Sequence, residues 1–363
     1  MWHENPIVKM CKIRFPIIQA PMSGVATPRL VAAVSNAGGL GSLGAAYMSP
    51  QEIRESIQEI RTLTEQPFAI NLFACASAPK NTRLINSAKE FLERYRNDLG
   101  IPQTAADFSS FPDFFEQFEV ILSEKVPVFS FTMGIPPLPL LQQMKKQKTM
   151  IMGTATSLDE ALLLESSGVD AIIAQGVESG GHRGTFLDPA NDLMLGLSTL
   201  IPLFAHSLQV PVVAAGGIMN GEGIASVLAL GASAAQLGTA FIACPESGAP
   251  RPYKDSLLHP HSAETIITSA FSGRPARALR NKFTKEMSEH EAPIAPFPYQ
   301  NALTKEIRTV AAKMNRPDLM SLYAGQNYPL ITNLPASEII PLLVEQTVNA
   351  VQRLSNELLR RKT

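Results

Sequence analysis

Cysteine and net charge are both scarce in this sequence. Its 363 residues include three cysteines, Cys11, Cys75 and Cys244, and the formal net charge is -1 with an isoelectric point near 6.6. Widely spaced cysteines without a Cys-x-x-Cys pair argue against a disulfide framework and a zinc knuckle, and no metal is predicted. The lack of a basic excess argues against nucleic acid or an anionic membrane as the main partner. We therefore expect a small-molecule ligand and a reducing, cytoplasmic location.

Features of secreted and membrane proteins are also missing. The chain begins Met-Trp-His-Glu-Asn-Pro, which has neither the basic start nor the apolar core of a secretory signal peptide. Residues 193–221 carry no charge, but Pro202, Pro211 and the Gly216-Gly217 pair interrupt them. This pattern predicts a buried helix followed by a buried strand rather than a membrane span. The sequence leaves open whether the chain forms a homo-oligomer.

The sequence does contain a series of short apolar runs, and hydrophobic residues make up 45% of it. The runs are continuously apolar rather than alternating, which is typical of parallel strands that are covered on both faces. They predict eight strands: Ile17–Ala20, Leu40–Leu43, Phe68–Leu72, Val128–Phe131, Thr149–Met152, Ala171–Gln175, Val212–Ala215 and Ala235–Leu237. Helix starts fall between them, at Thr27-Pro28 and at predicted capping boxes that open with Ser49 and Ser157.

Alternating strands and helices predict an α/β fold, a (β/α)8 TIM barrel, with a doubly wound open sheet as the alternative. Two regions exceed a minimal barrel. Residues 74–125 predict a partly helical insertion, and residues 242–334 predict a smaller, mainly helical substrate or cap domain. The apolar spacing of residues 337–359 predicts the last barrel helix. The barrel would then comprise residues 1–241, including the insertion, and residues 335–363.

A glycine-rich loop that contains one histidine follows the sixth predicted strand. The strand ends at Gln175, and the loop Gly176–Gly184 carries His182. In TIM barrels the loops after the strands form the active site, and a histidine can exchange protons near neutral pH. His182 is therefore the candidate catalytic base, with a loop histidine bonded to backbone as the alternative. Arg274, Arg277 and Arg280 would either steer an anionic substrate or lie exposed.

Glycines also follow the last two predicted strands, in Ala214-Ala-Gly-Gly-Ile218 and Gln236-Leu-Gly-Thr-Ala240. Such loops expose backbone N–H groups beside helix N-termini and commonly hold a phosphate in barrels. Amide side chains end two other strands, at Asn71 and Gln175. Amides suit the edge of an isoalloxazine ring, although each could equally tie down a loop.

Several motifs in the same order resemble those of one family. They are Gln19-Ala-Pro-Met-Ser-Gly24, Thr27-Pro28, Ser35-Asn-Ala-Gly-Gly-Leu-Gly41, Asn71-Leu-Phe73, the run from Gln175 to Gly184, Ala214 to Ile218, Gln236 to Thr239, Ser272-Gly-Arg-Pro-Ala-Arg277, Gln300 to Thr304 and Ala324-Gly-Gln326. Together they resemble the class I nitronate monooxygenases, formerly called 2-nitropropane dioxygenases. That family consists of FMN-dependent barrels with a helical substrate domain, and the resemblance runs nearly end to end.

The resemblance implies roles for individual residues. His182 is similar to the catalytic base of the family. The residues that match its FMN contacts are Asn71, Gln175, Gly180, Gly217, Gln236, Leu237, Gly238 and Thr239, with Met22 bordering the ring. The implied reaction is oxidation of alkyl nitronates by O2 to a carbonyl compound and nitrite. The family suggests a detoxification activity on nitro compounds such as propionate 3-nitronate.

Two other functions remain open at this point. FMN-dependent enoyl-acyl-carrier-protein reductases share the barrel and a similar Gly-Gly-His loop, but take hydride from NAD(P)H. A barrel that binds a phosphate ligand without catalysis is the other, because fold alone does not fix function.

Overall fold

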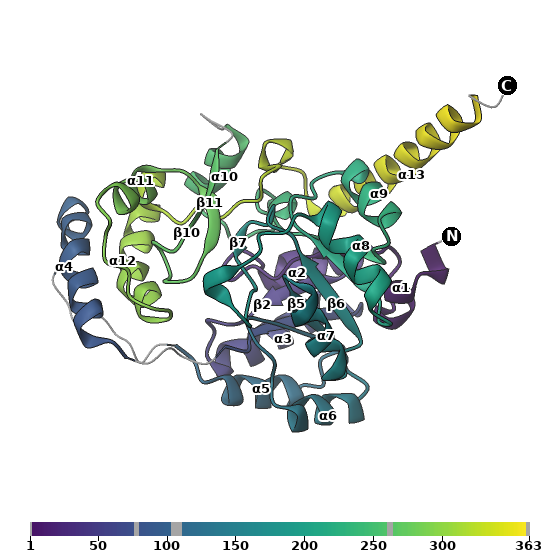
Figure 1. The fold of residues 1–363 in the computed structure, drawn as a ribbon, viewed down its shortest axis with the longest axis horizontal. Helices are drawn as coiled ribbons and strands as arrows, with labels where there is room; N and C mark the ends of the chain where they lie inside the picture. The colour runs from purple at the N-terminus through teal and green to yellow at the C-terminus, as the bar shows by residue number, and fades with distance from the viewer. Residues whose placement is uncertain (1, 76–79, 103–110, 260–263, 361–363) are drawn as a thin grey trace.

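The structure is a computed structural model, and it describes residues 2–75, 80–102, 111–259 and 264–360. An eight-stranded parallel sheet forms its centre (Figure 1). The strands are β1 Ile17–Gln19, β2 Gly41–Gly44, β3 Phe68–Phe73, β4 Val128–Thr132, β5 Met150–Ala155, β6 Ala171–Gln175, β8 Val212–Ala215 and β9 Ala234–Leu237. A parallel bridge between Ile18 and Leu40 links β1 to the start of β2 at the opposite edge of the sheet. The sheet therefore curls into a barrel, and the TIM-barrel prediction is confirmed.

Helices pack around the outside of the barrel. They are α2 Pro28–Asn36, α3 Pro50–Leu63, α5 Phe114–Ser123, α6 Leu138–Lys146, α7 Leu158–Ser166, α8 Leu197–Ser207, α9 Gly221–Ala229 and α13 Ala336–Arg360. The predicted start signals operate at α2, which Thr27 caps, and at α3, where Ser49 and Glu52 form a capping box. Helix α13 packs on α9 and α2, so it returns to the barrel after the long preceding segment.

The capping box predicted at Ser157 is half wrong. The Ser157 hydroxyl accepts the N–H of Glu160 as expected. The buried Glu160 carboxylate instead accepts hydrogen bonds from the N–H and hydroxyl of Thr156, and from the N–H groups of Phe186 and Leu187. Tertiary contacts outweigh the local motif because these donors would otherwise be buried without an acceptor. The carboxylate thereby anchors the chain just after the loop Gly176–Gly184 that carries His182, which is called the histidine loop below.

A short helix that was not predicted from the sequence, α1 Pro6–Cys11, fills the amino-terminal end of the barrel. The Asn5 side chain accepts the N–H groups of Ile7 and Val8, and its amide donates to the carbonyl of Ser233 at 2.6 Å. The apolar side of α1 packs against the inner residues of the strands. This end of the barrel is therefore closed by packed side chains.

A second hydrophobic core lies beside the barrel, on the side where α4, α11 and α12 appear in Figure 1. Its helices are α4 Thr82–Asp98, α10 Arg251–Leu258, α11 Lys282–Glu289 and α12 Tyr299–Lys313. An antiparallel sheet joins this core to the histidine loop, in the order β10 Thr265–Thr268, β11 Ala276–Leu279 and β7 Gly181–His182. This sheet could not be predicted from the sequence, because strands of two to four residues leave no readable periodicity.

The predicted insertion, residues 74–125, contributes to both cores. Helix α5 packs on α3 and β3, whereas α4 packs on α12. We therefore propose that α4 belongs with residues 242–334 as one cap around the second core. Single-turn helices complete the described elements: η1 Trp2–Glu4, η2 Pro189–Asn191, η3 Thr239–Phe241, η4 Pro317–Leu319 and η5 Tyr328–Leu330. Within the described ranges, no helix combines the length and apolar character needed to cross a membrane.

Candidate active site

A cavity of about 880 Å³ opens at the carboxyl ends of the barrel strands, and residues of both cores line it. Its lining includes the predicted residues Met22, Asn71, Gln175, Gly180, His182, Gly217, Gln236, Gly238 and Thr239. Leu237 is the exception, because its side chain is buried in the hydrophobic cluster that also contains Ile17 and Phe241. The structure thus gathers these residues around one space. Their contact with a cofactor stays a prediction.

His182 reaches the cavity because β7 pairs with β11, where Ala276 lies opposite it. Its Nε2 atom lies 2.8 Å from the Oγ atom of the buried Ser272. Aromatic rings surround the imidazole, with centroid distances of 5.4 Å to Tyr323 and 6.0 Å to Phe73. The imidazole is therefore held by a side chain and by packed rings, rather than by a backbone group as in the alternative interpretation.

The surroundings of His182 lower its pKa from 6.5 to about 3. Burial is the largest cause, because removing water disfavours the imidazolium. The guanidinium groups of Arg274 and Arg308 lower the pKa further by repulsion. The imidazole is consequently neutral near pH 7, and the adjacent cations make this part of the site more favourable for an anion than for a cation.

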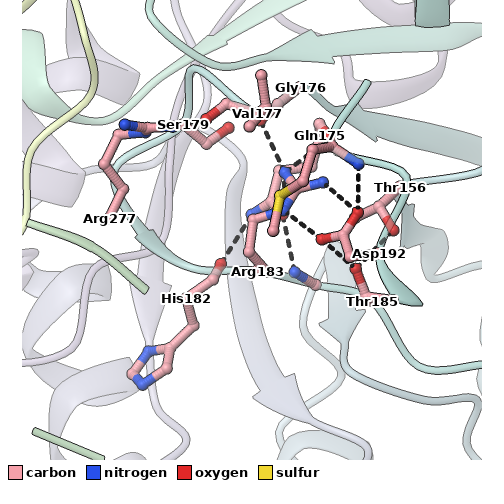
Figure 2. Close-up of polar contacts among 12 residues, drawn as sticks. Thr156, Gln175, Gly176, Val177, Ser179, His182, Arg183, Thr185, Asp192 and Arg277 are labelled. Atoms are coloured by element: carbon pink, nitrogen blue, oxygen red, sulfur yellow. Dashed lines mark hydrogen bonds and ion pairs between the residues drawn. The ribbon is translucent and has the colours of Figure 1, made fainter. Parts of the chain in front are cut away.

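A buried ion pair stabilises the histidine loop on the side away from the His182 ring (Figure 2). The Nε atom of Arg183 lies 2.7 Å from a carboxylate oxygen of Asp192, and the two side chains are 2% and 4% exposed. Arg183 also donates to the carbonyl of Gly176 at 2.8 Å, and the Thr185 hydroxyl donates to Asp192 at 2.9 Å. In Figure 2 the His182 ring points away from this network. Arg183 therefore stabilises the conformation of the loop, while the adjacent His182 faces the cavity.

The two strand-end amides have different surroundings. The Gln175 amide donates to the carbonyl of His182 at 3.0 Å, and its oxygen accepts the N–H of Gly184 at 2.8 Å. Tying down the loop is thus a role that the structure gives to Gln175. The Asn71 amide donates to the Ser130 hydroxyl at 2.9 Å, while the described residues offer its oxygen no donor. Asn71 therefore retains an open acceptor at the cavity.

Glycine backbones converge on one end of the cavity. Gly216 and Gly217 have φ values of +142° and +63°, and the described residues provide no acceptor for their N–H groups. A Cβ atom at Gly217 would lie 2.9 Å from that of Glu178, and one at Gly180 would lie 2.5 Å from the carbonyl carbon of Ala324. Free N–H groups in such a turn, just before α9, form the kind of nest that binds phosphate.

Several lining residues were not singled out from the sequence. The hydroxyl groups of Tyr47 and Thr132 are buried without a hydrogen-bond partner among the described residues. Thr132 ends β4, so the strand-end rule that selected Asn71 and Gln175 could have found it. Tyr47 and Tyr323 reach the cavity from segments outside the strands, and no local motif marks them.

The cationic residues at the cavity come mainly from α12. Lys305, Arg308 and Lys313 line it, and none of its described lining residues is an aspartate or a glutamate. Of the three arginines considered from the sequence, Arg274 lies close enough to affect His182. Arg277 is buried and donates to the carbonyl of Val177 at 2.9 Å, and the exposed Arg280 pairs with Glu264.

Comparison with known proteins shows the family of the chain. The family model described as nitronate monooxygenase matches residues 4–346. The chain belongs to the nitronate monooxygenase family. A probable nitronate monooxygenase of Staphylococcus aureus (strain MSSA476) is 39% identical over 353 residues, which cover 97% of this chain and 99% of the relative.

Two solved structures support the family and its fold. A nitroalkane oxidase from Streptomyces ansochromogenes superposes with a TM-score of 0.90 at 39% identity, covering 96% of this chain and 99% of that one. FabK from Thermotoga maritima reaches a TM-score of 0.76 at 30% identity, covering 97% and 99%. The resemblance inferred from the motifs is confirmed, as is the enzyme class. This member of the nitronate monooxygenase family is an oxidoreductase.

Proposed function

We propose that this protein uses FMN to oxidise alkyl nitronates with O2, giving a carbonyl compound and nitrite, as a cytoplasmic detoxification activity. The observation that carries the proposal is the neutral imidazole of His182, whose pKa the charges of Arg274 and Arg308 help to lower, at a cavity whose described lining contains no carboxylate. A nitronate is a small anion, and this charge pattern suits one.

The residues present fit FMN. The free N–H groups of Gly216 and Gly217 would hold its phosphate, and the Asn71 oxygen and Thr132 hydroxyl are open polar atoms for the ring. The remaining predicted contacts are Met22, Gln175, Gly180, Gln236, Leu237, Gly238 and Thr239, with Leu237 limited to its backbone. When bound, the flavin supplies the electron transfer between nitronate and O2, which no protein side chain here provides.

The environment of His182 favours an ionised nitronate over a neutral nitroalkane as substrate. General bases work best when their pKa lies near the working pH, and the pKa of His182 is about 3. Such a weak base removes a proton from a neutral nitroalkane poorly. A substrate that is already ionised needs no base, so His182 would bind and orient it. Ser272 would fix the ring for this task through the 2.8 Å contact with Nε2.

The decisive experiment records anaerobic absorbance spectra of the purified protein before and after adding ionised nitroethane. Freshly dissolved neutral nitroethane is the matched control, and NADH goes into a parallel cuvette. We expect FMN bands that are bleached by the nitronate and restored by air with release of nitrite. Bleaching by NADH alone would favour the reductase function suggested by the FabK likeness. FMN bands unchanged by either compound would favour a non-catalytic barrel, and a flavin-free protein would overturn the FMN proposal.

A further inference from the structure

Tyr47 presents a hydroxyl group that has no hydrogen-bond partner among the described residues. It follows β2 by three residues and lines the same cavity as His182. Its hydroxyl oxygen is buried, and the described residues offer it neither a donor nor an acceptor. A buried hydroxyl without a hydrogen bond costs stability, and a ligand bound in the cavity that Tyr47 lines could supply the partner.

The ring of Tyr47 is held in place by its neighbours. It makes edge-to-face contacts with Phe73 and Phe111, with centroid distances of 5.6 Å and 5.8 Å. Phe73 also contacts the ring of His182, with a centroid distance of 6.0 Å, so one aromatic side chain contacts both Tyr47 and His182. A ring held by two others loses little further entropy when its hydroxyl binds a ligand.

The surrounding charges decide what kind of partner fits. Burial raises the pKa of the Tyr47 phenol, and nearby Tyr323 raises it further, although Arg308 and Arg274 oppose the shift. The phenol therefore stays protonated at working pH and can donate a hydrogen bond. A donor near two guanidinium groups favours a negatively charged acceptor, because hydrogen bonds to ionised oxygens are the stronger ones.

We propose that Tyr47 binds the substrate by donating a hydrogen bond from its hydroxyl to an oxygen of the nitronate O–N–O group. This inference rests on the proposed function for the identity of the anion. The donor itself is a property of the cavity. Because the bond would form in the bound substrate and persist during the reaction, Tyr47 should affect KM more than kcat.

The test is Tyr47→Phe, which removes one oxygen and keeps the ring. With ethyl nitronate, whose nitronate group is its sole oxyanion, we expect KM to rise about tenfold or more and kcat to change little. The Tm of the protein without substrate should stay equal or rise, because the variant no longer buries an unpartnered hydroxyl. An unchanged KM, or a clearly lower Tm without substrate, would overturn the proposal.

Tyr253→Phe is the matched control for the stability measurement. Tyr253 lines the same cavity, but its hydroxyl already donates to the carbonyl of Tyr323. Removing that hydroxyl breaks an existing bond and leaves a carbonyl unpaired, so its Tm should fall. The two substitutions make the same chemical change and should move Tm differently.

Sodium nitrite separates this inference from the proposed function. Nitrite has the O–N–O geometry and charge of the nitronate head, and its binding can be measured by calorimetry without turnover. We expect Tyr47→Phe to weaken nitrite binding about tenfold or more. Weakened nitrite binding would sustain the Tyr47 proposal even if the wild-type protein oxidised no nitronate. Equal affinity in both proteins, or no binding to the wild type, would overturn it.

Discussion

At the scale of single residues, the neutral state of His182 has a consequence for stability. Its pKa is about 3 in the folded chain and about 6.5 when unfolded, so between these values the unfolded chain binds the extra proton. Above pH 6.5 the titration of His182 therefore leaves the free energy of unfolding unchanged. As the pH falls from 6.5 toward 3, this group progressively lowers the free energy of unfolding. At pH 5 we expect a loss of about 1–2 kcal/mol from this group.

This loss can be measured by urea unfolding of the wild type and of His182→Asn at pH 7 and at pH 5, which gives the free energy of unfolding of each protein. The wild type should lose about 1–2 kcal/mol more than the variant between the two pH values. Parallel losses in the two proteins would contradict the depressed pKa.

Ser272 gives a second prediction at this scale. Its hydroxyl is buried, contacts the His182 ring and also accepts the N–H of Arg274 at 3.3 Å. Ser272→Ala should free the ring and lower kcat/KM for a nitronate about tenfold, whereas Ser272→Thr, which keeps a hydroxyl, should recover part of it. Ser226→Ala is the control, because Ser226 is exposed on α9. Steady-state oxygen consumption measures kcat/KM for all three variants. An equal loss of kcat/KM in Ser272→Ala and Ser272→Thr would argue against a role of the hydroxyl.

The residues that could be predicted from the sequence lie at or just after strand ends. Asn71, Gln175 and Gly217 come directly from strands whose carboxyl ends meet at one edge, so barrel geometry places them together. Tyr47 and Tyr323 depend on how distant segments pack, which no local pattern encodes. Gln175 shows the limit even at strand ends, because only the structure reveals that its amide ties down the loop.

At the scale of elements, the histidine loop depends on the Arg183–Asp192 pair. Asp192→Asn would leave the Arg183 guanidinium buried without its counter-ion, and breaking such a pair typically costs about 3–5 kcal/mol. The pair Arg251–Asp255 is a control of the same chemistry on a helix surface, with exposures of 91% and 52%. Asp255→Asn should cost less than about 0.5 kcal/mol. Urea unfolding measures the free energy of unfolding of both variants. Similar losses in Asp192→Asn and Asp255→Asn would mean that the buried pair does not hold the loop.

The elements also show which sequence patterns survive in the fold. The strands of the barrel and the caps at Thr27 and Ser49 follow local rules and were predictable. The three-stranded sheet was not, because β7 owes its conformation to pairing with β11 rather than to its own residues. Helix α1 is equally a product of tertiary context, since six residues are too few to form a stable helix alone.

At the scale of the whole molecule, the cavity joins two cores. The barrel contributes lining residues such as Ile173 and Ala215, and the second core contributes Tyr253 and Met320. A ligand that binds between two cores stabilises both, by about 2.7 kcal/mol when its concentration is 100 times Kd. FMN should therefore make the two cores unfold together.

Leu92→Ala tests this coupling from a distance. Leu92 is buried in α4 within the second core and does not line the cavity, so the substitution should cost about 2–5 kcal/mol in that core. Trp2 is the one tryptophan of the chain and lies in η1, which packs on α1 at the filled end of the barrel, so its fluorescence should follow unfolding at that end. With FMN bound, Leu92→Ala should lower the midpoint seen by Trp2 fluorescence together with that seen by far-UV circular dichroism. If the Trp2 midpoint stayed at its wild-type value, the cores would be independent and the cavity would not couple them.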